Sequence, residues 1–263
     1  MDILIIGGNH PRHLYYINKI SNSHSVNGCI LQKRENIIPS LPLNIPEQDQ
    51  NNFQKHFDRR YEAEKKYFGD QSYPDCKTFE TTPDELNSLK TIEFVKSINP
   101  EIVLLFGCGL IKDQLRDVLP FYSVNLHGGL SPWYKGVATL FWPFYFLEPT
   151  YAGSTFHIIS PEADAGDIIH QTCPKLELND GIHDVGCKTI IESTKHMSKL
   201  LEIFEKNKQW TMHKQNGVGR TFRTKDFRPE HLRVIYDLFN DDIVKYYLEG
   251  RIHANSPNLI TQF

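Results

Sequence analysis

The chain has few cysteines, and their spacing matches no disulfide or metal-binding pattern. The five cysteines are odd in number and widely spaced, and no two of them form a Cys-x-x-Cys pair. They are Cys29, Cys76, Cys108, Cys173 and Cys187. This spacing indicates neither a disulfide scaffold nor a zinc knuckle, so we expect a protein of a reducing compartment without a bound metal.

Long apolar runs and a strong net charge are also missing. The longest apolar runs, 102–106 and 141–147, are far too short to span a bilayer, and no signal peptide opens the sequence. The net charge of −3 gives no general attraction to nucleic acid or to an acidic membrane. We therefore expect a soluble protein of the cytoplasm, with neither nucleic acid nor membrane as a partner.

The length and the opening residues indicate an α/β fold. A chain of 263 residues can bury one good core and a small appendage. Residues 2–6 form an apolar run that is followed by Gly7-Gly8-Asn9 and by a helical stretch from 11 to about 20. A buried parallel strand that leads through glycine into a helix is a Rossmann-like opening, although the Gly-x-Gly-x-x-Gly spacing of dinucleotide-binding proteins is absent.

The turn after this first strand is a candidate phosphate site. Its backbone amides, Gly8 among them, lie where a helix begins, and a helix start favours an anion. Asn9, His10 and Arg12 could assist with their side chains. A plain tight turn without a ligand explains the same residues equally well.

Hydrophobic periodicity and turn residues predict the other elements. We expect strands at 26–31, 102–106, 122–127 and 210–213, and helices at 51–68, 82–97, 136–147, 182–206 and 228–250. Thr82-Pro-Asp-Glu85 is a capping box that would open its helix. Pro143 should kink or end the helix at 136–147.

The middle of the chain places two polar side chains at the end of a strand. Asn125 and His127 are two residues apart, so they share one face at the sheet edge where open α/β sheets bind their ligands. An amide and an imidazole side by side could hold an oxygen that becomes negative during acyl transfer. The loop 161–167 adds Asp164 and Asp167, and a carboxylate facing His127 would raise its pKa. Each motif alone is more typical of a turn or an ordinary loop.

Three motifs follow one another in an order that is known from a protein family. They are Asn125-Leu-His127, Ser131-Pro-Trp-Tyr-Lys-Gly136 and Asp164-Ala-Gly166. In this order the chain resembles the N10-formyltetrahydrofolate-dependent formyltransferases, over roughly residues 1–225. It departs from them in Gly-Gly-Leu-Ser-Pro where Ser-Leu-Leu-Pro is common, and in Lys135 where arginine is usual. The expected fold is α/β and Rossmann-like, with helices on both faces of a mostly parallel sheet and a short C-terminal strand and helix extension.

The resemblance implies a catalytic trio of Asn125, His127 and Asp164. A primary amine would attack the formyl group of N10-formyltetrahydrofolate, and Asn125 with a protonated His127 would stabilise the negative oxygen. Asp164 would keep His127 charged and help to remove the amine proton. The motif favours Asp164 over Asp167 for this role, which the spacing alone does not.

The resemblance also implies how the folate co-substrate is bound. The glycine-rich loop would hold the pterin ring through its backbone, because only a backbone with few side chains approaches a flat ring closely. This loop consists of Phe106, Gly107, Cys108, Gly109 and Leu110. His157 and Asp164 would contact the same molecule, although an ordinary strand residue is equally plausible for His157.

The acceptor follows from the same resemblance. We expect a catalytic domain at 1–207 with an insertion at 32–80, and a small C-terminal extension at 208–263 that could pair two copies in a homodimer. The insertion and the extension are similar to those of sugar N-formyltransferases, which act on nucleotide-linked amino sugars for surface polysaccharides such as the O-antigen of lipopolysaccharide. A dTDP-linked 4-amino-4,6-dideoxyhexose is the expected acceptor. It would contact Gly8, Asn9, His10, Arg12, Trp133, Tyr134 and Lys135.

Other functions remain open from the sequence. Glycinamide ribonucleotide formyltransferases and methionyl-tRNA formyltransferases share the catalytic motifs. A non-catalytic nucleotide-binding module is the alternative from a different class, and the intact Asn125, His127 and Asp164 speak against it.

Overall fold

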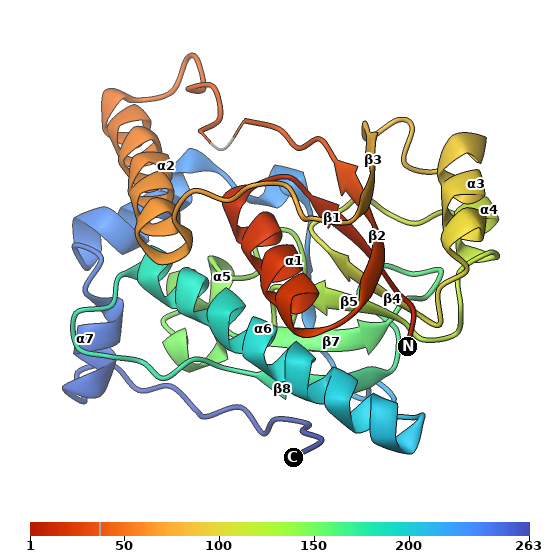
Figure 1. Cartoon of the computed structure of the whole chain (residues 1–263). Coiled ribbons are helices and arrows are strands. Elements are labelled where there is room, and N and C mark those ends of the chain that lie inside the picture. The colour runs from red at the N-terminus through yellow and green to blue at the C-terminus, as the bar shows by residue number, and fades with distance from the viewer. Residues whose placement is uncertain (37) are drawn as a thin grey trace.

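Seven strands form the main sheet of the protein, in the order β3-β2-β1-β4-β5-β7-β8 (Figure 1). The computed structural model describes residues 1–36 and 38–263. The strands are β1 (Ile3–Gly8), β2 (Val26–Gln32), β3 (Lys77–Thr81), β4 (Ile102–Phe106), β5 (Ser123–His127), β7 (Ser154–Ile158) and β8 (Ile168–Thr172). Neighbours from β3 to β5 are parallel, and β7 is antiparallel to both β5 and β8. The expected mostly parallel sheet is confirmed.

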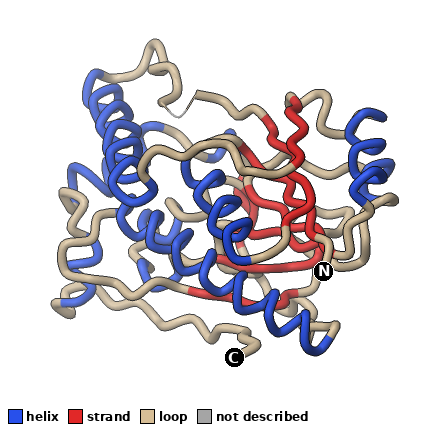
Figure 2. Tube along the Cα trace, viewed as in Figure 1, coloured by secondary structure: helices blue, strands red, loops and turns tan. Residues whose placement is uncertain are grey.

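Helices cover both faces of this sheet, as expected (Figure 2). They are α1 (Pro11–Ser23), α2 (Glu47–Phe68), α3 (Leu89–Ile98), α4 (Asp113–Arg116), α5 (Trp142–Tyr145), α6 (Ile182–Asn207) and α7 (Ile243–Leu248). The alternation along β1 explains the two layers, because successive side chains of a strand point to opposite faces. Ile3 and Ile5 join the core beneath α1 and α6, whereas Leu4 and Ile6 join the core beneath α3 and α4.

The strand order reverses between β1 and β4, and open α/β sheets bind ligands at such a switch point. The strands β1, β4 and β5 end at this edge with Gly8, Phe106 and His127. Helix α1 begins there because it directly follows β1. Helix α6 begins at the same edge, because it follows β8, which runs in the direction of β5. Two helix starts and three strand ends therefore lie at the same edge of the sheet.

Two predicted helices differ from the structure near their predicted starts. Helix α3 begins after Ser88, whose side chain accepts a hydrogen bond from the Thr91 amide, and the predicted capping box at 82–85 forms a separate turn. The segment 136–147 contains only α5, and Pro143 lies in its first turn rather than at its end. The reason is that Gly136 completes β6 (Tyr134–Gly136), which pairs with β9 (Arg220–Phe222) in a second small sheet.

The C-terminal part is less regular than predicted. In place of one helix at 228–250, the chain forms a 3-10 turn at Pro229–His231, a π-helical turn at Val234–Leu238 and α7. Asn240 and Asp241 have positive φ angles of 50° and 66°, which interrupt any continuous helix. Asp241 then accepts a hydrogen bond from the Ile182 amide at the start of α6, at 3.0 Å. The predicted strand at 210–213 is reduced to a single bridge between His213 and Ile168.

The C-terminal segment packs into the body of the protein. Leu232, Ile235 and Val244 share one buried cluster with Phe57 of α2 and Trp142 of α5. The predicted boundary at 207/208 stays a prediction, and the residues on its two sides share this core.

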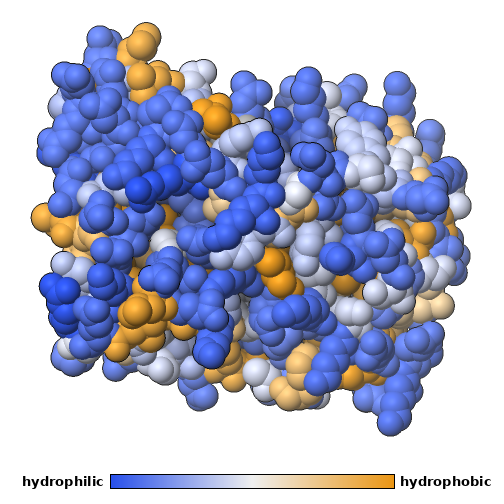
Figure 3. Space-filling model, turned by 60° about the vertical axis from the view of Figure 1, so that its left-hand side comes forward, coloured by the Kyte–Doolittle hydropathy of each residue, from blue (hydrophilic) through white to orange (hydrophobic). Residues whose placement is uncertain are grey.

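The surface offers little continuous apolar area on the face that Figure 3 shows, where hydrophobic residues form small separate groups among hydrophilic ones. No helix in residues 1–36 and 38–263 combines the length and the hydropathy that a bilayer crossing needs.

Candidate active site

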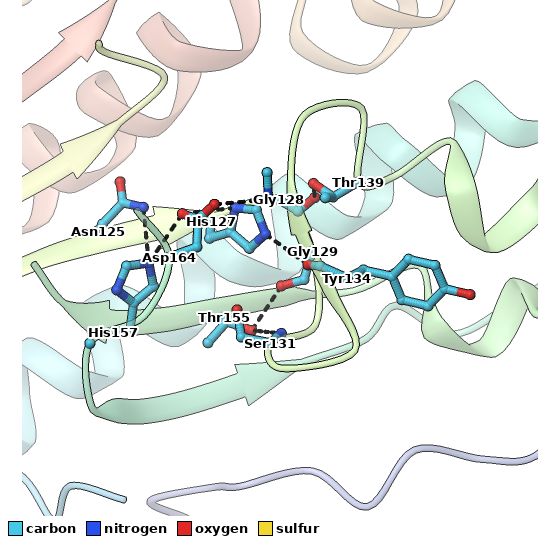
Figure 4. Close-up of polar contacts among 12 residues, drawn as sticks. Asn125, His127, Gly128, Gly129, Ser131, Tyr134, Thr139, Thr155, His157 and Asp164 are labelled. Carbon is cyan, nitrogen blue, oxygen red and sulfur yellow. Dashed lines mark hydrogen bonds and ion pairs between the residues drawn. The ribbon is translucent and has the colours of Figure 1, made fainter. Parts of the chain in front are cut away.

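Asn125 and His127 lie together at the end of β5 (Figure 4). Asn125 stands opposite His157 of β7, and its Nδ2 lies 3.1 Å from His157 Nε2. His157 Nδ1 lies 2.9 Å from the Ile158 carbonyl oxygen, so Nδ1 carries the hydrogen and Nε2 accepts from Asn125. One amide hydrogen of Asn125 is thereby used, and the second is left for a ligand.

Asp164 closes this cluster from the loop between β7 and β8. Its Oδ1 lies 3.4 Å from His127 Nδ1 and 3.6 Å from His157 Nε2, and its Oδ2 accepts a hydrogen bond of 3.0 Å from the Gly136 amide. Its φ angle of 53° is uncommon for a residue with a side chain, and surrounding contacts must hold it. His157 contacts both Asn125 and Asp164, so it joins the three residues that were predicted as catalytic.

Asp167, the rival carboxylate, is directed elsewhere. Its Oδ2 lies 3.0 Å from Lys214 Nζ, and its side chain is partly exposed. In the described part of the chain, no ion pair joins Asp167 to His127. The geometry therefore favours Asp164 as the partner of His127.

The pKa of His127 moves in the direction opposite to our expectation. Burial lowers the pKa of His127, and the charge of Asp164 opposes this without overcoming it. Burial pushes the pKa of Asp164 upward, but its contacts with His157 and His127 outweigh burial and bring the pKa to about 2. Asp164 is thus charged at neutral pH while His127 rests neutral. The expected raised pKa of His127 was wrong, because one carboxylate does not replace the lost hydration of an imidazolium.

Two residues that were not predicted as site residues hold the loops of the site. The Thr155 hydroxyl donates to the Gly129 carbonyl at 2.8 Å and accepts from the Ser131 amide at 2.9 Å. Gln215 Nε2 donates to the Asp164 carbonyl at 2.8 Å. Thr155 is two residues before His157 on β7. Residues at this spacing share one face of a strand, so the sequence could have indicated that Thr155 faces the site. Gln215 follows the loop by 51 residues, and no pattern in the sequence points to it.

A cavity of about 190 Å³ opens beside the cluster. Six predicted site residues line it: Cys108, Gly109, Leu110, Asn125, His157 and Asp164. Phe106 and Gly107 were predicted to contact the cofactor but lie apart from this lining. Both pack against the ring of His13, which fills the space between the ends of β1 and β4.

The cavity fits part of a folate. Its volume is below the roughly 300–1,000 Å³ of pockets that enclose drug-sized ligands, so it takes one flat ring system rather than a whole folate. The loop backbone is partly engaged already, since the Gly109 amide donates to Gln32 Oε1 at 2.6 Å and the Leu110 carbonyl accepts from Asn87 Nδ2 at 3.0 Å. The amide, imidazole and carboxylate at one end of the cavity supply polar partners beside that ring.

The residues that were predicted for the acceptor separate into groups. His10 and Arg12 line a larger cavity of about 410 Å³. Gly8 and Asn9 are not among its described lining. A Cβ on Gly8 would lie 2.3 Å from a neighbouring histidine ring, and Asn9 Oδ1 accepts a hydrogen bond from the Arg34 amide at 2.9 Å. The turn after β1 is therefore used largely for packing.

The residues of the loop after His127 make contacts that differ from those we expected. Tyr134 cannot stack on a base, because its side chain is buried and its hydroxyl donates to Glu148. Its carbonyl oxygen lies 3.0 Å from His127 Nε2. Trp133 packs edge-on against Tyr151, and Lys135 lies partly buried on β6, close enough to lower the pKa of His127.

The sequence did not reveal most of the lining of the larger cavity. His56, Arg60 and Glu64 of α2 and His183 of α6 face this space. The four-residue spacing on α2 was the available signal, because such residues share one face of a helix.

An amide, an imidazole and a carboxylate lie together beside the carboxyl end of β5, and such groups can stabilise charge that develops during group transfer. Residues 43–200 match the formyl transferase family, and the chain belongs to that family.

Among curated relatives, the bifunctional polymyxin resistance protein ArnA of Wigglesworthia glossinidia brevipalpis is 30% identical over 127 residues. This match covers 48% of the chain and 19% of that relative. The methionyl-tRNA formyltransferase of Caldicellulosiruptor saccharolyticus is 26% identical over 130 residues, which cover 46% of the chain and 42% of that relative. The chain thus matches less than half of the length of each relative.

Solved structures share the fold at low sequence identity. The N-formyltransferase of Helicobacter canadensis, in complex with folinic acid and dTDP-3-aminofucose, has a TM-score of 0.58 at 18% identity, and the match covers 95% of this chain and 82% of that one. The phosphoribosylglycinamide formyltransferase of Anaplasma phagocytophilum has a TM-score of 0.57 at 13% identity, with 85% and 98% covered. At these identities the two structures show the fold alone.

Proposed function

We propose that the protein transfers a formyl group from N10-formyltetrahydrofolate to the primary amine of a nucleotide-linked amino sugar. The observation that carries this proposal is the cluster of Asn125, His127, His157 and Asp164 beside the 190 Å³ cavity. An amide donor and an imidazole–carboxylate pair are the groups that acyl transfer to an amine requires.

Asn125, His127 and Asp164 have separate roles in this transfer. When bound, the folate supplies the formyl group that the amine attacks. Asn125 donates its free amide hydrogen to the oxygen that becomes negative, and His127 lies on the same face of β5. Both nitrogens of His127 face oxygen atoms, Tyr134 O at 3.0 Å and Asp164 Oδ1 at 3.4 Å, so a second ring proton finds an acceptor. Asp164 is charged at neutral pH, and it stabilises the imidazolium that forms when His127 takes the amine proton. That proton is then given to the folate nitrogen as its bond to the formyl carbon breaks.

The acceptor that we propose is a dTDP-linked 4-amino-4,6-dideoxyhexose, followed by its 3-amino relative. The structure from Helicobacter canadensis that contains dTDP-3-aminofucose supports a dTDP-linked amino sugar as the acceptor, since its fold matches 95% of this chain. The product would serve the synthesis of a surface polysaccharide such as the O-antigen of lipopolysaccharide, and we place the reaction in the cytoplasm.

Formation of tetrahydrofolate tests this function. Incubated with N10-formyltetrahydrofolate, the protein should release tetrahydrofolate only when an amino sugar nucleotide is added. Glycinamide ribonucleotide is the discriminating competitor, because its formyltransferases share the fold at a similar TM-score. Efficient turnover with glycinamide ribonucleotide and none with amino sugar nucleotides would overturn the proposed acceptor.

We also propose that the protein is a homodimer that pairs through its C-terminal segment. Leu238 and Leu248 of this segment are exposed, at 70% and 45%, and they supply apolar area for such an interface. Sedimentation at micromolar concentration should give twice the chain mass of 30.5 kDa, and a single chain mass would contradict the proposal.

A further inference from the structure

The 410 Å³ cavity lies next to the catalytic loop, between the starts of α1 and α6 and one face of α2. Val137, Ala138 and Leu140 form one of its walls. Between them, Thr139 donates a hydrogen bond to the carbonyl of Gly128, the residue after His127. A ligand in this cavity is therefore separated from the catalytic histidine by a single loop.

One end of the cavity is polar and carries a net positive charge. Glu64 Oε1 lies 2.8 Å from Arg12 Nη2 and 3.1 Å from Arg60 Nε. Glu35 also lines the cavity, but it pairs with Arg34 at 3.1 Å, so the two guanidinium groups and Glu64 leave one positive charge in excess. Burial lowers the pKa of nearby His10, so that it adds no charge at neutral pH. Within the described residues, Arg12 Nε and Glu64 Oε2 are buried and have no hydrogen-bond partner. The Glu64 side chain is only 5% exposed, and its Oε2 can accept a hydrogen bond from a ligand in the cavity.

The other end is aromatic. The rings of His56 and His183 lie 4.4 Å apart, and Phe141 and Phe227 contact His56 at 6.0 and 6.2 Å between ring centroids. His56 Nδ1 is engaged by the Tyr236 hydroxyl at 2.9 Å. His183 Nε2 is buried and has no partner in the part of the chain that the structure describes. Burial lowers the pKa of His56 to about 3 and that of His183 well below its usual value, so both rings are neutral.

A ligand that satisfies both ends must combine an anionic group with a flat polar ring. Guanidinium groups bind phosphate oxygens through charge-assisted hydrogen bonds. Aromatic walls take a flat ring by stacking, and a neutral imidazole nitrogen adds one directional hydrogen bond. A nucleoside diphosphate has these two parts, separated by a sugar that carries hydroxyl groups.

We infer that this cavity binds the nucleoside diphosphate of the acceptor and that helix α2 selects it. Arg60 and Arg12 hold the diphosphate, His183 Nε2 bonds to the base, and Glu64 Oε2 accepts a hydroxyl hydrogen from a sugar ring. This inference rests on the proposed function for the identity of the acceptor, and it assigns recognition to residues 56–64 of α2 together with the start of α6.

Calorimetric titration of the whole protein with dTDP and UDP tests this assignment separately from catalysis. Arg60→Gln should weaken the binding of dTDP at least tenfold and leave the much weaker binding of thymidine unchanged. His183→Phe keeps a ring of similar shape but removes the nitrogen, so it should weaken dTDP and thymidine by a similar factor. Lys65→Gln removes the same charge from an exposed position on α2, and it should change neither affinity.

The outcomes separate the inference from the proposed function. Binding of dTDP that depends on Arg60, without formyl transfer to any amino sugar nucleotide, supports the cavity assignment and contradicts the proposed function. Formyl transfer with a KM that neither Arg60→Gln nor His183→Phe alters would overturn the cavity assignment alone. Failure of both dTDP and UDP to bind the wild-type protein would overturn it as well. If Arg60→Gln fails to fold, Arg60→Lys replaces it, because it keeps the charge beside Glu64 but lacks the planar fork and should still lose affinity.

Discussion

At the scale of single residues, His127 is placed so that its charge state can change during the reaction. Burial favours the neutral ring, whereas the oxygen atoms of Tyr134 and Asp164 face its two nitrogens. In the neutral ring, one nitrogen without a hydrogen faces an oxygen atom. Uptake of a proton relieves that contact, and this suits a group that accepts a proton when the amine attacks.

Substitutions of the catalytic trio should abolish most of the activity without unfolding the protein. Asn125→Ala, His127→Ala and Asp164→Ala should each lower kcat by about a hundredfold or more, which is the usual effect of losing one stabilising donor. Asp167→Ala is the matched control, because Asp167 pairs with exposed Lys214, and it should keep most of the rate. Steady-state kinetics with circular dichroism of each variant measure this. A dead Asp167→Ala enzyme beside an active Asp164→Ala enzyme would show that the wrong carboxylate was assigned.

The sequence brought together the proposed catalytic residues better than it did the residues that contact them. Asn125, His127 and Asp164 are fixed by motif order, and the strand period places the first two on one face. Gln215 and His183 come from distant segments, and only the folded chain brings them to the sites that they line. Tyr134 was assigned to the acceptor from the resemblance, but its burial and its hydrogen bond to Glu148 are tertiary effects.

At the scale of elements, the buried strands were predictable and the short helices were not. The apolar runs of β1 and β4 have one interpretation, because they are hydrophobic and lead directly into glycine. The strand β5 was predicted from the alternation of polar and apolar residues along it. The capping box at 82–85 has a valid local pattern, yet the chain starts α3 at Ser88. The segment 228–250 breaks at Asn240 and Asp241, because Asp241 is needed at the start of α6.

The pairing of β6 with β9 should be sensitive to a single methyl group. Gly136 has a φ angle of 92°, and a Cβ there would lie 2.0 Å from the Phe222 carbonyl oxygen. Its amide also holds Asp164 Oδ2, so Gly136→Ala should lower both the free energy of unfolding and kcat. Gly69→Ala is the control, since Gly69 has a φ angle of 63° but nothing lies within 4 Å of its Cβ position.

Urea unfolding and kinetics of the two glycine variants separate the effect of backbone strain from that of the steric clash between the new Cβ atom and the Phe222 carbonyl oxygen. Gly69→Ala should lose only about 1–2 kcal/mol, the usual strain of a left-handed residue, and keep its activity. Gly136→Ala should lose more than this together with most of its activity. Equal losses of stability and unchanged kcat in both variants would show that the β6–β9 pair does not position Asp164.

At the scale of the whole molecule, buried histidines should make stability depend on pH. Burial lowers the pKa of six of them, to about 3 for His56 and about 4 for His170: His10, His13, His56, His127, His170 and His183. In the unfolded chain these groups take up protons near pH 6.5, so below that pH the unfolded state binds more protons than the folded state. Stability therefore falls as the pH falls from 7 toward 4.

The size of this effect follows from proton counting. Each histidine that stays neutral in the folded state contributes a slope of up to about 1.4 kcal/mol per pH unit below its unfolded pKa. Urea unfolding at pH 7.5, 6.5 and 5.5 should show a midpoint that declines steeply across the last interval. A midpoint that stays level or rises toward pH 5.5 would mean that these histidines are protonated within the folded protein.

The identity of the product tests the central claim most directly. The wild-type protein is incubated with N10-formyltetrahydrofolate and a dTDP-linked 4-amino-4,6-dideoxyhexose, and the sugar nucleotide is analysed by mass spectrometry. We expect an acceptor that has gained one formyl group on its amine, in an amount equal to the tetrahydrofolate released. The Asn125→Ala variant should form almost no formylated acceptor. An unchanged mass for every amino sugar nucleotide, with formylated glycinamide ribonucleotide formed under the same conditions, would contradict it.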